Sequence, residues 1–102
     1  MAQTAERAQL ELTFLVKQES GVWTALCLEL DIASCGPTNS DALESLKGLV
    51  ELYVEDCLSQ GEYPIPLRPV PCQALQDFLS PRQTPELSIT SRRASFPIHA
   101  QA

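Results

Sequence analysis

Hydrophobic and polar residues alternate along residues 9–18, and this is the clearest pattern at the start of the chain. A period of two predicts a β-strand with one face buried. Glu19-Ser20-Gly21 comes next and predicts a hairpin turn, because Gly21 can take a positive φ without steric penalty. The buried face of this first strand is expected to hold Leu10, Leu12, Phe14 and Val16.

Residues 22–30 are the second predicted strand, and residues 32–35 a short third one. The opposite face of the first two strands then carries Leu15, Trp23 and Ala25. These three need cover from another subunit or from the C-terminal segment, which predicts self-association. The core face of the second strand is expected to hold Val22, Thr24, Leu26, Leu28 and Leu30.

A long amphipathic helix is predicted after Gly36-Pro37, which ends the third strand. Thr38 is the expected N-cap, because its hydroxyl can accept a hydrogen bond from the backbone N–H of Asp41. The charge of Asp41 also suits the positive end of the helix dipole. Gly61 predicts the helix end. Between these limits one apolar stripe recurs at steps of three and four residues: Ala42, Leu43, Leu46, Leu49, Val50, Tyr53, Val54 and Cys57.

The composition changes after Gly61, because seven of the eight prolines lie from residue 64 onward. Prolines force the segment 63–66 to be extended. Residues 73–79 predict a short helix, and one of the weakly strand-like segments 86–90 and 94–98 is expected to add a fourth strand. Residues 80–86 are expected to form a loop and residues 99–102 a free end.

A length of 102 residues fits one small domain. We divide the chain into a flexible leader (1–8), a main domain (9–66) and a Pro-rich C-terminal extension (67–102) that holds the short helix and the added strand. The predicted fold class is α+β: a three- to four-stranded, mainly antiparallel sheet with one long helix packed on one face.

Charge is distributed unevenly along the chain. Residues 1–62 hold 11 acidic and 3 basic residues, a net charge of −8, whereas residues 63–102 hold 2 acidic and 4 basic residues, a net of +2. An acidic domain argues against direct binding to nucleic-acid phosphates and suits a basic protein partner. The alternative is that the acidity serves solubility alone.

Four cysteines, at 27, 35, 57 and 72, show no Cys-x-x-Cys spacing, and the single histidine, His99, lies in the tail. This argues against a zinc site, and no cofactor or metal is predicted. The first ten residues lack the apolar core of a signal peptide, and no apolar run approaches a membrane span. We therefore expect a cytoplasmic protein with reduced thiols and no membrane association.

Abundant carboxylates raise the question of a two-metal nuclease, which needs several carboxylates converging on two cations. Those on the predicted helix fall opposite its apolar stripe, where a solvated surface explains them. Arg92 and Arg93 give too small a footprint for nucleic-acid binding. The carboxylates considered are Glu11, Glu29, Asp31, Asp41, Glu44, Glu51, Glu55 and Asp56.

The connection between the second and third strands offers a candidate binding surface. Glu29 and Asp31 flank Leu30, beside the apolar residues Leu28 and Ile32. Apolar anchors mixed with charge are typical of protein interfaces. Leu28, Glu29, Asp31 and Ile32 are the predicted partner-binding residues, although the apolar ones also fit an ordinary core.

Several of these features together resemble the HicB-like family, the antitoxin-type partners of HicA RNA-cleaving toxins, over roughly residues 10–66. Gly36 and Thr38 match the family's Gly-x-Thr corner, and residues 41–43 match its acidic-Ala-Leu helix start. Residues 29–34 are similar to those of a subgroup without a DNA-binding appendage. Leu46, Leu52 and Tyr53 match later helix positions.

The resemblance implies a cut-down ribonuclease H-like fold that has lost catalysis. It also implies a binding protein that masks a basic HicA-like toxin or another small basic protein, with Gly36, Thr38 and Asp41 in structural roles at the helix start. The residues after Gly61 show no DNA-binding domain of the kind that full-length relatives carry, so direct DNA binding is not expected. The alternative function is a homo-oligomeric interaction module without a toxin.

Overall fold

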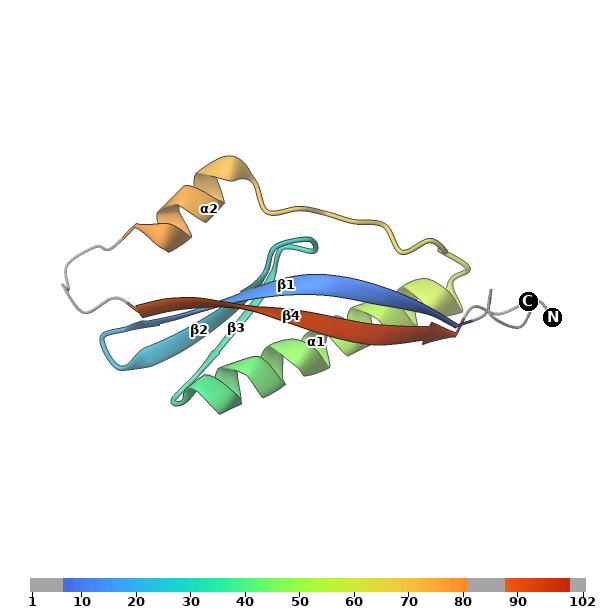
Figure 1. The fold of residues 1–102 in the computed structure, drawn as a ribbon. Helices are drawn as coiled ribbons and strands as arrows, with labels where there is room; N and C mark the ends of the chain where they lie inside the picture. Colours follow the sequence, from blue (N-terminus) through green and yellow to red (C-terminus); the bar gives the residue numbers. More distant parts are fainter. Residues whose placement is uncertain (1–6, 81–87, 100–102) are drawn as a thin grey trace.

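The computed structural model describes residues 7–80 and 88–99 and has an α+β fold with a four-stranded antiparallel sheet. The strands lie in the order β3-β2-β1-β4, so the first and last segments of the chain pair with each other. The long helix α1 covers one face of the sheet, and the short helix α2 with the segment before it lies along the other face (Figure 1).

The first two strands, β1 (Arg7–Glu19) and β2 (Val22–Cys27), form the predicted hairpin. Ser20 and Gly21 connect them with φ values of 54° and 79°. Two consecutive positive φ values are typical of the two-residue turns that match the twist of a hairpin. The period-two prediction for β1 is confirmed, because its α1-facing side is buried at Leu12, Phe14 and Val16.

The second strand differs from the prediction in length and in face. It ends at Cys27, and residues 28–31 turn back toward β3, with Asp31 at a φ of 55°. The hairpin pairs Gln18 with Trp23 and Val16 with Ala25. Directly paired residues share a face, so the core face of β2 is the one we expected to be uncovered. It carries Trp23, Ala25 and Cys27, whereas Leu26 is buried on the opposite face, opposite Leu15.

Strand β3 (Ile32–Gly36) leads into α1 (Asn39–Ser59), as predicted. Thr38 caps the helix by accepting a hydrogen bond of 3.0 Å from the backbone N–H of Asp41. Gly61, at a φ of 77°, ends it: the N–H of Gly61 bonds the carbonyl of Leu58, and the next N–H bonds that of Cys57. This pair of hydrogen bonds is the usual way a glycine closes a helix.

The predicted apolar stripe of α1 packs on the sheet with one exception. Leu49 is 40% exposed and lies on the flank of the helix rather than in the core. Leu43 and Tyr53 are half-buried against the core. The buried residues of the stripe are Ala42, Leu46, Val50, Val54 and Cys57.

The fold prediction placed a helix on only one face of the sheet, and this is corrected by the structure. A second helix, α2 (Cys72–Leu79), lies along the face opposite α1. The extended segment before it donates backbone hydrogen bonds of 2.9 Å from Arg68 and Val70 to the β2–β3 turn. Lys17 reaches α2, where its Nζ donates to the carbonyl of Phe78 at 2.9 Å and lies 4.4 Å from the ring centroid. The second face of the sheet is therefore partly covered from within the chain, which removes the reason given for self-association.

The fourth strand, β4 (Ser88–His99), is a single strand that takes in the described part of the first predicted weak segment, residues 88–90, and all of the second, residues 94–98. It pairs with β1 from Gln18–Ser88 to Arg7–His99, so His99 belongs to the sheet rather than to a free end. The chain outside the described residues includes most of the predicted leader, most of the predicted loop and residues 100–102.

Candidate protein-binding surface

The β2–β3 turn places its predicted partner-binding residues in different environments. The Glu29 carboxylate accepts hydrogen bonds from the backbone N–H and the hydroxyl of Thr13, at 2.7 and 2.9 Å. Leu28 and Ile32 are half-buried, and Asp31 is exposed. The Glu29 carboxylate therefore holds the turn against β1 through hydrogen bonds, whereas the Asp31 carboxylate is exposed to solvent.

The three structural residues meet at the start of α1. Gly36 faces the helix so closely that an added Cβ would lie 2.9 Å from the Cβ of Asp41 and 3.0 Å from the backbone nitrogen of Ala42. Thr38 bonds Asp41 as described above. The corner therefore sets how closely α1 approaches β3, and Gly36 permits that approach because it has no side chain.

Burial is expected to lower the reactivity of two of the four free cysteines, Cys27 and Cys57. Burial raises the pKa of Cys27 to about 11 and also raises that of Cys57, whereas Cys35 and Cys72 are exposed. The thiolate is the reactive form. We expect Ellman's reagent at pH 8 to titrate two thiols in the folded protein and four in denaturant. Rapid reaction of a third thiol in the folded protein would contradict the packing of β2 and α1.

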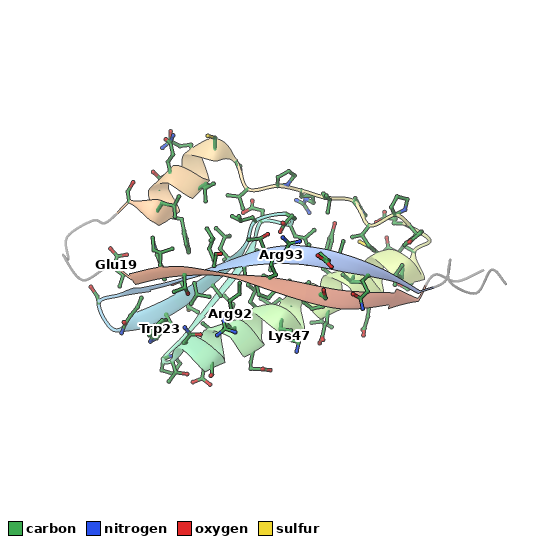
Figure 2. All side chains as sticks on the ribbon, viewed as in Figure 1. Glu19, Trp23, Lys47, Arg92 and Arg93 are labelled. Atoms are coloured by element: carbon green, nitrogen blue, oxygen red, sulfur yellow. The ribbon has the colours of Figure 1, made fainter. Side chains whose placement is uncertain are left out.

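A groove runs between α1 and β4 on the same face of the sheet, because α1 packs mainly on β3 and β2 and leaves β4 largely uncovered apart from the buried Phe96. Its first hollow, of about 270 Å³, is lined by Leu43, Glu44 and Lys47 of α1 and by residues 92–96 of β4. Figure 2 shows Lys47 and Arg92 on the α1 side of the sheet and Arg93 on the opposite side.

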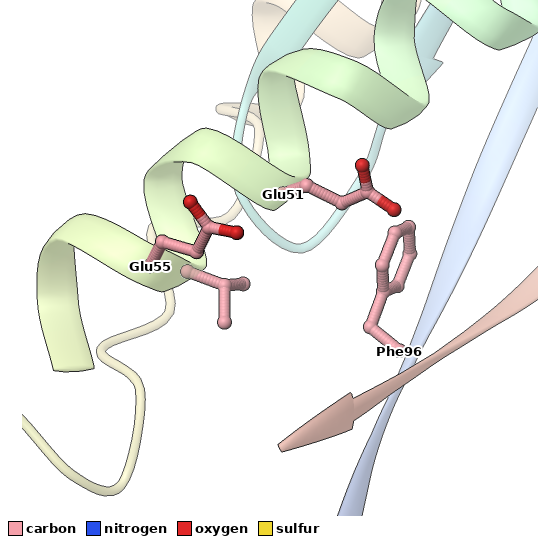
Figure 3. Close-up of a pocket in the computed structure, with 4 residues that line it drawn as sticks. Glu51, Glu55 and Phe96 are labelled. Carbon is pink, nitrogen blue, oxygen red and sulfur yellow. The ribbon is translucent and has the colours of Figure 1, made fainter. Parts of the chain in front are cut away.

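The second hollow of the groove has a volume of about 210 Å³ and is lined by Glu51, Val54, Glu55 and Phe96. Figure 3 shows the two carboxylates on the helix side and the Phe96 ring reaching toward them from β4. Phe96 lines both hollows, so they form one groove. Its helix wall is acidic, and its floor is aromatic and apolar.

The solvent side of α1 carries most of the charge in this region. The helix holds five carboxylates and a single basic residue, Lys47, a net charge of −4 from 5 acids and 1 base. All six side chains are exposed. The carboxylates are Asp41, Glu44, Glu51, Glu55 and Asp56.

Sequence reasoning assigned Glu51 and Glu55 to a solvated face but missed the groove that they line with Phe96. The helical spacing of the two glutamates could have placed them on one flank of α1. Their position beside Phe96 depends on the pairing of β4 with β1, which no local signal reveals. Among the described residues, no three His, Cys, Asp or Glu side chains gather as a metal ion would require.

Comparisons with protein-family models, with curated proteins and with solved structures find no match to this chain. Neither helix in the described part of the chain is both long and apolar enough to cross a membrane.

Proposed function

We propose that this chain is a HicB-like, antitoxin-type protein that binds and masks a basic HicA-like RNA-cleaving toxin. The observation that carries the proposal is the solvent side of α1, with five exposed carboxylates and one lysine. The sequence resemblance over roughly residues 10–66 supplies the family. The α+β architecture is consistent with it, and the finer assignment to a cut-down ribonuclease H-like fold is part of the proposal.

The mechanism would be steric and electrostatic. The acidic surface attracts a partner of opposite charge, and the docked chain blocks the path of RNA to the toxin's active site. In this mechanism the chain takes part in no bond-making step, so the proposal is for a binding protein rather than an enzyme, acting in the cytoplasm without a cofactor. The exposed Asp31 extends the acidic surface at the β2–β3 turn.

Association with the toxin is expected to slow as salt rises, because counterions screen attraction between opposite charges. Glu44→Lys should lower the association rate, since Glu44 is exposed on α1. Asp77→Lys is the matched control: it makes the same change in net charge from exposed α2 on the other face of the sheet. Stopped-flow or surface-based kinetics at several salt concentrations would measure both variants.

Equal slowing by the two variants would show that net charge alone matters and would contradict docking on α1. Tight, sequence-specific binding to duplex DNA would contradict the proposal as well. The alternative function, a homo-oligomeric module without a toxin, is favoured by one observation, the open edge of β4. A gene for a small basic protein beside this one favours the toxin partner, and its absence favours the alternative.

A further inference from the structure

Strand β4 leaves one long edge of the sheet open. It is the last strand in the order β3-β2-β1-β4, and its outer edge pairs with no strand among residues 7–80 and 88–99. The opposite edge, β3, has 5 residues, whereas β4 has 12. An open edge presents a row of backbone N–H and C=O groups that can pair with another strand. Pro97 removes one donor near the end of β4, which leaves Ser88–Phe96 for such pairing.

Arg92 stands at the centre of this edge on the face that α1 covers elsewhere. Its partner in the sheet is Phe14, whose side chain points to the core, so Arg92 shares that face. Arg92 is exposed, and within the described part of the chain its guanidinium group makes no hydrogen bond or ion pair. Arg93, on the opposite face, pairs with Glu11 at 2.8 Å. The two neighbouring arginines therefore differ, and only Arg92 is available to a partner.

The hollow lined by Glu51, Val54, Glu55 and Phe96 has the chemistry that a guanidinium group needs. Two exposed carboxylates on its helix wall can accept charge-assisted hydrogen bonds, and the small exposed part of Phe96, 4% of that residue's surface, adds an apolar contact. Its volume of about 210 Å³ has room for one such group. The hollow and Arg92 lie on the same face of β4, four residues apart along the strand.

We propose that two copies of this chain pair antiparallel through their β4 edges around Ala94, so that each Arg92 enters the Glu51–Glu55 hollow of the other copy. Pairing Ala94 with its own equivalent sets Arg92 opposite Phe96 of the second copy. Opposite residues on one face have Cβ atoms about 4.5–5.5 Å apart. An arginine side chain can span the remaining gap to the helix wall.

The charges disfavour two of the other symmetric registers. A two-fold axis through Arg92 or Arg93 would place two like charges directly opposite each other, which is destabilising. With the axis at Ala94, the two Arg92 side chains are separated by about four residues of strand, roughly 13 Å. Each then faces carboxylates, and the half-buried Ala94 is small enough to sit on the axis. The two-fold symmetry forms the contact twice.

This pairing does not depend on the proposed toxin partner, and sedimentation velocity of the full chain tests it. We expect a species of twice the 11.2 kDa chain mass at micromolar concentration. Arg92→Glu or Glu51→Arg should raise the dimer dissociation constant roughly tenfold or more, because each places like charges in contact at both copies of the site. The double variant Arg92→Glu/Glu51→Arg should restore dimerisation, because it exchanges the two charges.

Asp77→Arg is the matched control, since it makes the same change of charge as Glu51→Arg at an exposed residue of α2, on the other face of the sheet, and its dimer should match the wild type. Circular dichroism melts of each variant establish that it is folded. A wild-type chain that sediments only as the 11.2 kDa monomer, even at a concentration of about 100 μM, would overturn the proposal. So would a dimer that Arg92→Glu leaves unchanged, or a folded double variant that stays monomeric.

Discussion

Replacing Leu46 with alanine is expected to lower the free energy of unfolding by about 2–5 kcal/mol. Leu46 is 0% exposed at the centre of the α1 stripe and belongs to the core cluster formed with β1 and β2. Its removal leaves a cavity that a close-packed interior cannot fully collapse. A loss of this size is a large part of the stability of a small domain. Urea unfolding followed by circular dichroism measures it.

Leu49→Ala is the matched control on the same helix. Leu49 is 40% exposed, so the same truncation removes few buried contacts. We expect a change within about 0.5 kcal/mol. Equal losses from the two variants would mean that the helix packs on a different face from the one described.

Replacing Gly36 with alanine is expected to destabilise the fold by about 1–3 kcal/mol, through overpacking. The new Cβ would lie 2.9 Å from the Cβ of Asp41 and 3.0 Å from the backbone nitrogen of Ala42. These atoms belong to the capped first turn of α1, so they can move away only if the helix shifts relative to β3. Thermal and urea unfolding of the variant would show the loss.

Gly48→Ala serves as the opposite control. Gly48 lies inside α1, and an added Cβ would meet no atom within 4 Å. Alanine is favoured over glycine in a helix interior by about 1 kcal/mol. We therefore expect Gly48→Ala to stabilise the protein. Destabilisation there would mean that another part of the protein, or a second copy, packs closely against this turn of the helix.

The elements with strong local signals could be predicted from the sequence. Alternation in β1, the hydroxyl cap at Thr38 and the closing glycine at Gly61 each act within a few residues, so they identify their elements without tertiary information. The prediction of the core face of β2 was wrong because it considered this strand without its pairing to β1. A two-residue turn at Ser20 and Gly21 pairs Glu19 with Val22, and that pairing already decides which residues join the face of Val16.

The groove between α1 and β4 and the open edge of β4 depend on contacts between distant residues, so sequence patterns did not reveal them. Glu29 was predicted to bind a partner because acidic and apolar residues alternate there, and that stays a prediction; the hydrogen bonds that its carboxylate accepts from Thr13 of β1 had no local signal. Strand β4 lies at an edge and has one buried side chain among residues 89–96, Phe96. Its alternation was therefore too weak to predict one continuous strand.

Inhibition of RNA cleavage would show whether this chain binds and masks a toxin. A small basic HicA-like RNase, where one is encoded beside this gene, would be mixed with increasing amounts of the full chain and a labelled RNA. We expect cleavage to fall to the background level once the chain saturates the toxin, and we expect Glu44→Lys to shift the titration to higher concentration while Asp77→Lys does not. Undiminished cleavage at a large excess of the chain, or metal-dependent RNA cleavage by the chain itself, would contradict the account.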